Sequence, residues 1–288
     1  MTMFNTYLGN QTRSRIGNLF LHAILIIITA VFLLPLYWMV VTSLKGMSQV
    51  VASPPIWFPN PIVWKNYFDA LTFLPFGQFF LNTFIIAFFV IIGDLISCSW
   101  VAYGFARLRF PGRDLLFFIL VATMMVPFAV RLIPLFLIFK NLGWVNTYLP
   151  LIVPAFFGTP FFIFLIRQFF RSIPQDLVDA ARIDGASEIG IWWNIMLPLS
   201  KPALITVAIL AFQGVWNDFL APLVFLNDDS KWTVALGINA LLSPSGQAVE
   251  LWNWLMAAST AAILPMLIIF IFGQRYFVEG ITLTGMKG

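Results

Sequence analysis

Six long apolar stretches constrain the fold of this sequence more than any other feature. A helix needs about 20 mostly apolar residues to cross the hydrocarbon core of a bilayer. Prolines and polar residues interrupt the fourth and fifth stretches, which is tolerated where a neighbouring helix or a cavity satisfies the freed backbone groups. We therefore expect an all-α membrane protein, a single membrane domain over residues 1–288, with six transmembrane helices at about 18–41, 79–103, 115–139, 148–170, 202–225 and 254–276.

The composition excludes several other classes of protein. Hydrophobic residues make up 60% of the chain and charged residues 10%, whereas soluble domains carry about 25% charged residues. The single cysteine, Cys98, excludes an internal disulfide and a cysteine-based metal cluster. The basic residues are scattered and form no nucleic-acid-binding patch. No catalytic triad, metal motif or G-x-x-x-x-G-K-[ST] phosphate loop occurs, so we expect no catalytic residue, no metal and no cofactor bound by this chain.

Lysine and arginine are distributed unequally between the two sides of the expected bundle. Loops rich in these residues stay on the cytoplasmic side of a membrane. The poorer side holds only Lys45, Lys65, Lys140 and Lys231. Since the other side collects most of the remaining cations, we expect both termini to be cytoplasmic; these cations are Arg13, Arg15, Arg107, Arg109, Arg113, Arg167, Arg171, Arg182, Lys201, Arg275 and Lys287.

The loop between the fourth and fifth stretches, about residues 172–198, is the most acidic part of the chain. Pro174 suits the first turn of a helix, and Gly185 is a natural helix stop because it adopts positive φ without penalty. A second short helix over 186–195, ended by Pro198, completes the pattern. Two short helices joined by a glycine turn suit docking into a groove of a partner, but an ordinary surface loop explains the same pattern equally well.

This loop closely resembles the EAA loop of binding-protein-dependent ABC importers, whose pattern is E-A-A, three residues, G, nine residues, I-x-L-P. Here Asp179 replaces the glutamate of the pattern, which keeps the charge and shortens its reach. In that family the loop is a coupling helix that docks into the ATP-binding subunit. The resemblance implies a coupling loop formed by Asp179, Ala180, Ala181, Asp184, Gly185, Ala186, Ile195, Leu197 and Pro198.

Other parts of the chain narrow the resemblance to the MalG-like permeases of the carbohydrate-uptake group. These parts are residues 82–84, 102–112, 216–220, 274–280 and 285–288. The resemblance implies the MetI-like bundle of six spans in the bacterial inner membrane. It also implies half of a translocation pathway for a sugar or related polyol.

The same resemblance implies the partners of this chain. A second permease subunit would complete a heterodimer, and two copies of an ATP-binding subunit would hold the ATP and magnesium. An extracytoplasmic solute-binding protein would contact the proline- and tryptophan-rich first outer loop, about 45–77, and the loop after the fifth span. The resemblance does not identify the sugar.

Polar residues within the apolar stretches are candidates for the substrate pathway. A charge at the centre of a bilayer costs at least about 2.5–3.5 kcal/mol, so Asp94, Arg131 and Asp218 should be paired or face water. Trp216 and Asn217 precede Asp218, and together they offer the stacking surface and planar polar groups that bind sugars. The alternatives are that Asp94 and Asp218 pair with each other or cap broken helices, and that Arg131 extends to the membrane surface.

Two other functions remain open. A secondary transporter driven by an ion gradient would explain acidic residues at mid-membrane, but it would give no reason for the 179–198 pattern. An ABC permease for a peptide, an amino acid or a phosphate ester would share the coupling loop and differ only in cargo.

Overall fold

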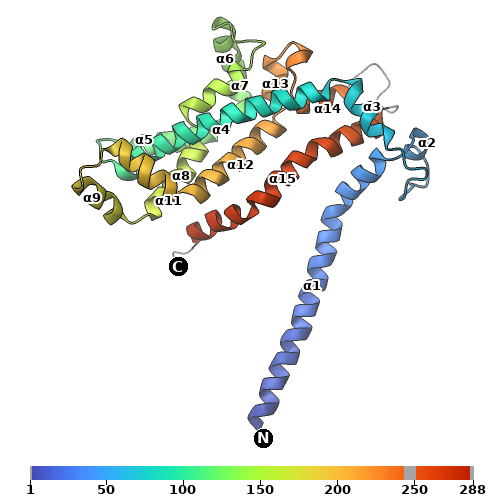
Figure 1. Cartoon of the computed structure of the whole chain (residues 1–288), viewed down its shortest axis with the longest axis horizontal. Helices are drawn as coiled ribbons and strands as arrows, with labels where there is room; N and C mark the ends of the chain where they lie inside the picture. Colours follow the sequence, from blue (N-terminus) through green and yellow to red (C-terminus); the bar gives the residue numbers. More distant parts are fainter. Residues whose placement is uncertain (1, 243–250, 286–288) are drawn as a thin grey trace. The chain divides into compact units, whose positions relative to one another are not determined.

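The computed structural model describes the backbone of residues 2–242 and 251–285, and the side chains of residues 18, 20–242 and 251–274. Every regular element in these ranges is helical (Figure 1). The chain divides into two compact units, each described by itself below: Met1–Ala70 with Leu241–Ala261, and Leu71–Ala240 with Ala262–Gly288. That both units belong to one membrane domain stays a prediction.

The first unit contains the long helix α1 (Thr2–Ser43), the short α2 (Met47–Val50) and most of α3 (Lys65–Phe73). Its first outer loop is organised around Lys45, which is only 1% exposed. The ammonium group lies 3.9 Å from the centre of the Trp38 ring, which favours a cation. The Asn66 amide donates to the backbone carbonyls of Ser43 and Lys45, both at 2.8 Å. Burial of Lys45 lowers its pKa.

The second unit is built on α4 (Phe76–Arg107), which packs along α8 (Pro160–Ser172) and α12 (Lys201–Asn217) (Figure 1). The short α7 (Leu149–Ile152) and η2 (Val153–Phe157) also contact α4. Gly93 of α4 permits this contact, because a Cβ there would lie 2.8 Å from the Phe156 ring. The core of the unit includes Cys98, Ala102, Tyr103, Ile163, Ile166 and Phe170.

The third expected span is broken. Helix α5 (Arg113–Ala122) and η1 (Thr123–Met125) are followed by α6 (Phe128–Asn141), which is bent from them by 99°. Val126 adopts an extended conformation before Pro127, as the steric clash with a following proline requires. The expectation of one continuous helix over 115–139 is therefore wrong.

The fifth expected span is also interrupted. Helix α12 ends at Asn217, and α13 (Leu220–Phe225) starts after a break at Asp218. The elements η4 (Asp229–Lys231), α14 (Val234–Leu242) and α15 (Trp252–Gly285) follow. A continuous helix over 202–225 is therefore not formed.

Four segments in the described ranges are long and apolar enough to cross a membrane as they stand: Phe20–Ser43, Phe76–Arg107, Leu149–Ser172 and Trp252–Gln274. Two bent pairs pass the same test together, Arg113–Met125 with Phe128–Asn141, and Glu188–Leu199 with Lys201–Asn217 at 80°. Six spans, the expected number, are reached when each bent pair counts as one.

Candidate functional site

The first half of the expected coupling loop is helix α9 (Gln175–Ile183), which starts directly after Pro174. Gly185 follows with φ +83°, the left-handed conformation that favours glycine. Its amide donates to the Arg182 carbonyl at 3.0 Å, and the Ala186 amide donates to the Ala181 carbonyl at 2.9 Å. These two bonds satisfy the last carbonyls of the helix and turn the chain back sharply, as the sequence predicts.

The second half starts at Ser187, whose hydroxyl accepts a hydrogen bond from the Gly190 amide at 3.2 Å and caps α10 (Glu188–Ile191). A turn of π-helix, η3 (Trp192–Met196), continues into α11 (Leu197–Leu199). The expected second helix therefore starts two residues later than 186. Pro198 lies within α11, and the helix ends one residue after this proline, at Leu199.

The motif residues divide into an outer and an inner group. Asp179, Ala180, Asp184, Gly185 and Ala186 are exposed, and Ala181 is half-buried. At the other end of the motif, Ile195 and Leu197 pack against the core of the unit, while Pro198 is exposed. The first group forms the accessible end of the loop, and the second group anchors it.

Two apolar side chains of α9 point away from the chain's own core. Val178 is fully buried and holds the helix down, but Ile183 is 86% exposed and Leu177 is also exposed. Single exposed apolar residues are ordinary. Here two of them border the small residues at the accessible end of the loop, so that α9 exposes an apolar surface there.

A series of hydrogen bonds that starts and ends on α4, called the α4–α9 ring, ties this loop to the C-terminal end of α4. The ring starts at Arg107 on α4, whose Nη1 donates to Gln175 Oε1 at 2.6 Å. Gln175 Nε2 donates to Asp179 Oδ1 at 3.0 Å, and Arg182 Nη1 lies 3.2 Å from the same oxygen. Figure 1 places α9 at the same end of the unit as the start of α5.

The ring closes through Glu188 of α10. Arg182 Nε donates to Glu188 Oε1 at 2.8 Å, and Tyr103, one turn before Arg107 on α4, donates its hydroxyl hydrogen to Glu188 Oε2. The hydrogen bonds to Glu188 raise the pKa of Arg182 above its usual value. Asp179 is thus engaged inside the loop, which its short reach permits.

Sequence reasoning missed five members of this arrangement: Tyr103, Arg107, Gln175, Arg182 and Glu188. Tyr103 and Arg107 are four residues apart and therefore lie on one face of α4. Two polar side chains on one face at the end of an apolar helix were the available sign that this end binds a polar partner. Their partners lie about 70 to 85 residues further along the chain. Nothing in the sequence pairs them with α4.

The first candidate for the substrate pathway, Asp94, lies in the packed interior of the second unit. It is 2% exposed, and its Oδ1 accepts hydrogen bonds from the Thr159 hydroxyl at 2.7 Å and the Cys98 thiol at 3.7 Å. Thr159 stands at the break before α8. The geometry favours a structural role for Asp94, which joins α4 to that break.

The Trp216–Asp218 group lies at the end of α12. Trp216 is buried, donates from Nε1 to the Ala262 carbonyl at 3.0 Å and stacks on Phe212 with ring centres 5.1 Å apart. Asp218 accepts from the Ala221 amide, in the first turn of α13, at 3.2 Å. Asn217 is exposed and donates to the carbonyl of Gln213 at 2.9 Å. Of these three residues, Asn217 presents the most accessible side chain.

Arg131 is exposed on the first turn of α6, with its guanidinium 5.8 Å from the Phe128 ring. The hydrogen bonds and ring contacts described for the five pathway candidates link none of them to another. Asp94, Arg131, Trp216, Asn217 and Asp218 therefore stay individual candidates for the substrate pathway.

Comparison with known proteins agrees with this geometry. Residues 96–283 match the family described as "Binding-protein-dependent transport system inner membrane component". The permease protein AraQ of the arabinooligosaccharides transport system of Bacillus subtilis (strain 168) is 36% identical over 266 residues, which cover 91% of this chain and 92% of AraQ. UgpE of Yersinia pestis, an sn-glycerol-3-phosphate transport system permease protein, is 34% identical over 92% of this chain and 95% of its own length.

Two further relatives extend the comparison. NgcG of Streptomyces coelicolor, a permease protein of a diacetylchitobiose uptake system, is 34% identical over 88% of this chain and 84% of its own length. A chain in the crystal structure of a bacterial ABC transporter involved in the import of the acidic polysaccharide alginate has a TM-score of 0.81 at 25% identity, covering 91% of this chain and 97% of that chain. This chain therefore belongs to the family of inner membrane components of binding-protein-dependent transport systems, and it is a multi-pass permease subunit of an ABC importer.

Proposed function

We propose that this permease forms half of the translocation pathway for a sugar or related polyol, and that the loop at 172–198 couples it to a separate ATPase. The cargoes named for its relatives, arabinooligosaccharides, diacetylchitobiose and sn-glycerol-3-phosphate, support a polyhydroxylated substrate. The observation that carries the coupling role is α9 itself. It is fixed to α4 on one side by the α4–α9 ring and presents Ile183, Gly185 and the small residues on the other.

The proposed complex contains a second, different permease subunit, two ATP-binding subunits with their ATP and magnesium, and an extracytoplasmic solute-binding protein. Both termini and α9 would be cytoplasmic, as the distribution of lysine and arginine favours. ATP hydrolysis is assigned to the partner because the sequence has no phosphate loop. The permease chain would bind no cofactor of its own.

This proposal is tested with the complex purified from membranes and reconstituted in lipid. We expect an ATP-binding subunit to co-purify, and its ATPase activity to rise when the solute-binding protein and a cognate sugar are both added. Oligosaccharides and sn-glycerol-3-phosphate are compared as cargo. If sn-glycerol-3-phosphate stimulates the ATPase and no uncharged sugar does, the transported substrate is a phosphate ester and not a sugar. Absence of any co-purifying ATPase would contradict coupling and favour a gradient-driven transporter.

Asp94→Asn tests whether Asp94 serves structure or transport. The amide oxygen of asparagine still accepts the hydrogen bond from Thr159, so we expect the uptake rate of proteoliposomes and the thermal stability of the complex to stay close to the parent. Asp94→Leu, which leaves the Thr159 hydroxyl without this acceptor, is expected to lower the free energy of unfolding by about 1–3 kcal/mol. Loss of uptake in a stable Asp94→Asn complex would instead place this carboxylate on the substrate pathway.

A further inference from the structure

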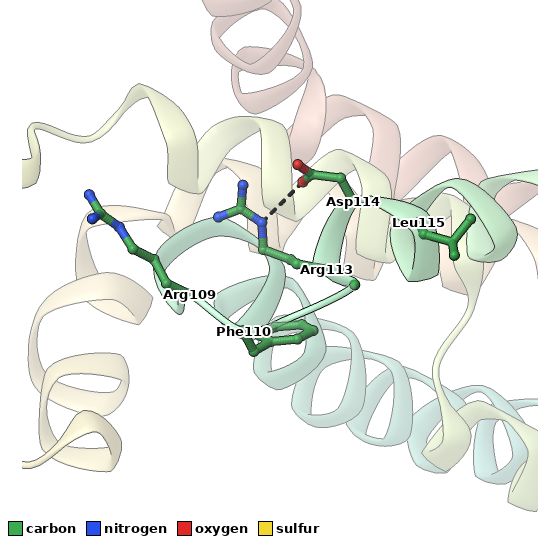
Figure 2. A pocket seen from close by; sticks show the side chains of 6 residues that line it. Arg109, Phe110, Arg113, Asp114 and Leu115 are labelled. Carbon is green, nitrogen blue, oxygen red and sulfur yellow. Dashed lines mark hydrogen bonds and ion pairs between the residues drawn. The ribbon is translucent and has the colours of Figure 1, made fainter.

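Two arginines that the coupling loop does not use lie near the junction of α4 and α5, one in the connecting loop and one at the first residue of α5. Arg109 and Arg113 line a hollow of about 380 Å³ together with Phe110, Gly112, Asp114 and Leu115. We call this the arginine hollow. Figure 2 shows the side chains of Arg109 and Arg113 extending from the two ends of the loop. Asp114 Oδ1 lies 3.1 Å from Arg113 Nε, an exposed contact that neutralises at most one of the two charges.

Positive charge around this hollow exceeds negative charge. Arg167 of α8 is buried nearby, with its guanidinium 3.8 Å from the Phe117 ring and its Nε donating to the Phe105 carbonyl at 3.3 Å. The charged groups acting on Arg167 are Arg171, Arg113 and Asp114, so one carboxylate faces several cations. An adjoining hollow of about 600 Å³ shares Arg109 and Arg113 and reaches Gln175 and Asp179 of α9.

An exposed apolar surface starts at the edge of the arginine hollow. Leu115, Leu116, Phe118 and Ile119 of α5 are each at least half exposed in the single chain. The hollow also lies at the first turn of α5, a ten-residue helix whose positive dipole end favours an anion. Two cations beside the start of an apolar helix face match a molecule with an anionic head and apolar tails. A soluble anion would leave the α5 face uncovered.

We propose that the arginine hollow binds the phosphate headgroup of an anionic phospholipid, whose acyl chains lie along the exposed face of α5. Two arginine forks supply the bidentate donors that suit phosphate oxygens. The site goes beyond the proposed transport function, and it relies on that proposal only in placing the α4–α5 loop at the cytoplasmic surface. Because the adjoining hollow includes Gln175 and Asp179, a bound headgroup would lie next to the α4–α9 ring.

The test uses the full chain, purified with the subunits that stay bound to it, in nanodiscs of phosphatidylcholine with or without phosphatidylglycerol. A photoactivatable phosphatidylglycerol serves as the probe, and labelling of the 107–122 peptide is measured. For Arg109→Gln/Arg113→Gln we expect labelling to fall about tenfold or more, since each arginine near the membrane surface attracts anionic lipid. The matched control Lys140→Gln/Lys201→Gln removes the same charge from two exposed lysines elsewhere and should label like the parent.

Three outcomes would overturn the proposal. The first is equal labelling of the arginine double variant and the parent. The second is equal thermal protection of the parent in phosphatidylcholine by inorganic phosphate and by phosphatidylglycerol, which would make the ligand a free anion. The third is loss of the co-purifying ATPase from the double variant in both lipids, which would make the loop a protein contact. The labelling measurement does not depend on ATPase activity. It therefore tests lipid binding even if the coupling proposal fails.

Discussion

Replacing Gly185 by aspartate is expected to abolish the stimulation of ATP hydrolysis by the solute-binding protein while the chain stays folded and assembled. Gly185 has φ +83°, and a Cβ there meets no atom within 4 Å. The backbone strain of a non-glycine residue in this left-handed conformation amounts to about 1–2 kcal/mol, which the packing of Val178 and Ile191 beneath the loop tolerates. Aspartate adds a second carboxylate beside Asp184, at the negative end of the α9 dipole and on the surface proposed to enter the partner.

The measurement is the ATPase rate of the reconstituted complex with and without the binding protein and sugar. Gly143→Asp is a matched control, because Gly143 also has positive φ, +70°, and open space around its Cα, but it follows α6 and lies outside the loop. Gly185→Ala separates strain from charge and should keep part of the stimulation. Full stimulation in an assembled Gly185→Asp complex would remove α9 from the coupling role.

The helical segments and the course of the coupling loop followed from local rules. Apolar stretches of about 20 residues located the spans, and Gly185 ended α9 because the closing hydrogen bonds need a residue that adopts positive φ. The expected helix over 115–139 overlooked a local rule that was available. Val126 precedes Pro127, and a residue before proline avoids the helical conformation. The apolar pattern continues through this dipeptide, so hydropathy alone does not show the break.

Contacts between residues far apart in the sequence could not be predicted from local sequence patterns. Whether Asp94 faces a cavity or Thr159 depends on a residue 65 positions away at another helix break. The α4–α9 ring has the same origin, since Tyr103 and Glu188 are 85 positions apart. Trp216 illustrates the ambiguity of aromatic residues in a span. Its ring suits sugar stacking, but the structure buries it against Phe212.

Within the α4–α9 ring, Arg107 is the side chain that links three parts of the second unit. Arg107 is buried, and its guanidinium donates to the carbonyls of Phe170 and Ile173 at the end of α8 as well as to Gln175 of α9. One side chain therefore joins α4, α8 and the coupling loop. Any displacement of α9 by a partner would act on both helices through this group.

Arg107→Met is expected to separate ATP hydrolysis from transport. Methionine fills much of the volume and donates no hydrogen bond, so the carbonyls of Phe170 and Ile173 lose a buried partner at a cost of about 1–3 kcal/mol for each group. We expect a complex of lower thermal stability that still hydrolyses ATP but takes up sugar at a small fraction of the parent rate. Uptake by proteoliposomes and ATPase activity are measured on the same preparation.

Two variants distinguish this role from general damage. Arg107→Lys keeps the charge but reaches fewer of the three acceptors, so it should fall between the parent and Arg107→Met in the ratio of uptake to hydrolysis. Lys201→Met removes an exposed cation at the start of α12 and should leave that ratio unchanged. If Arg107→Met loses stability while the ratio stays at the parent value, Arg107 supports the fold alone, and the coupling motion must reach α4 by the packing of Val178, Ile191 and Trp192.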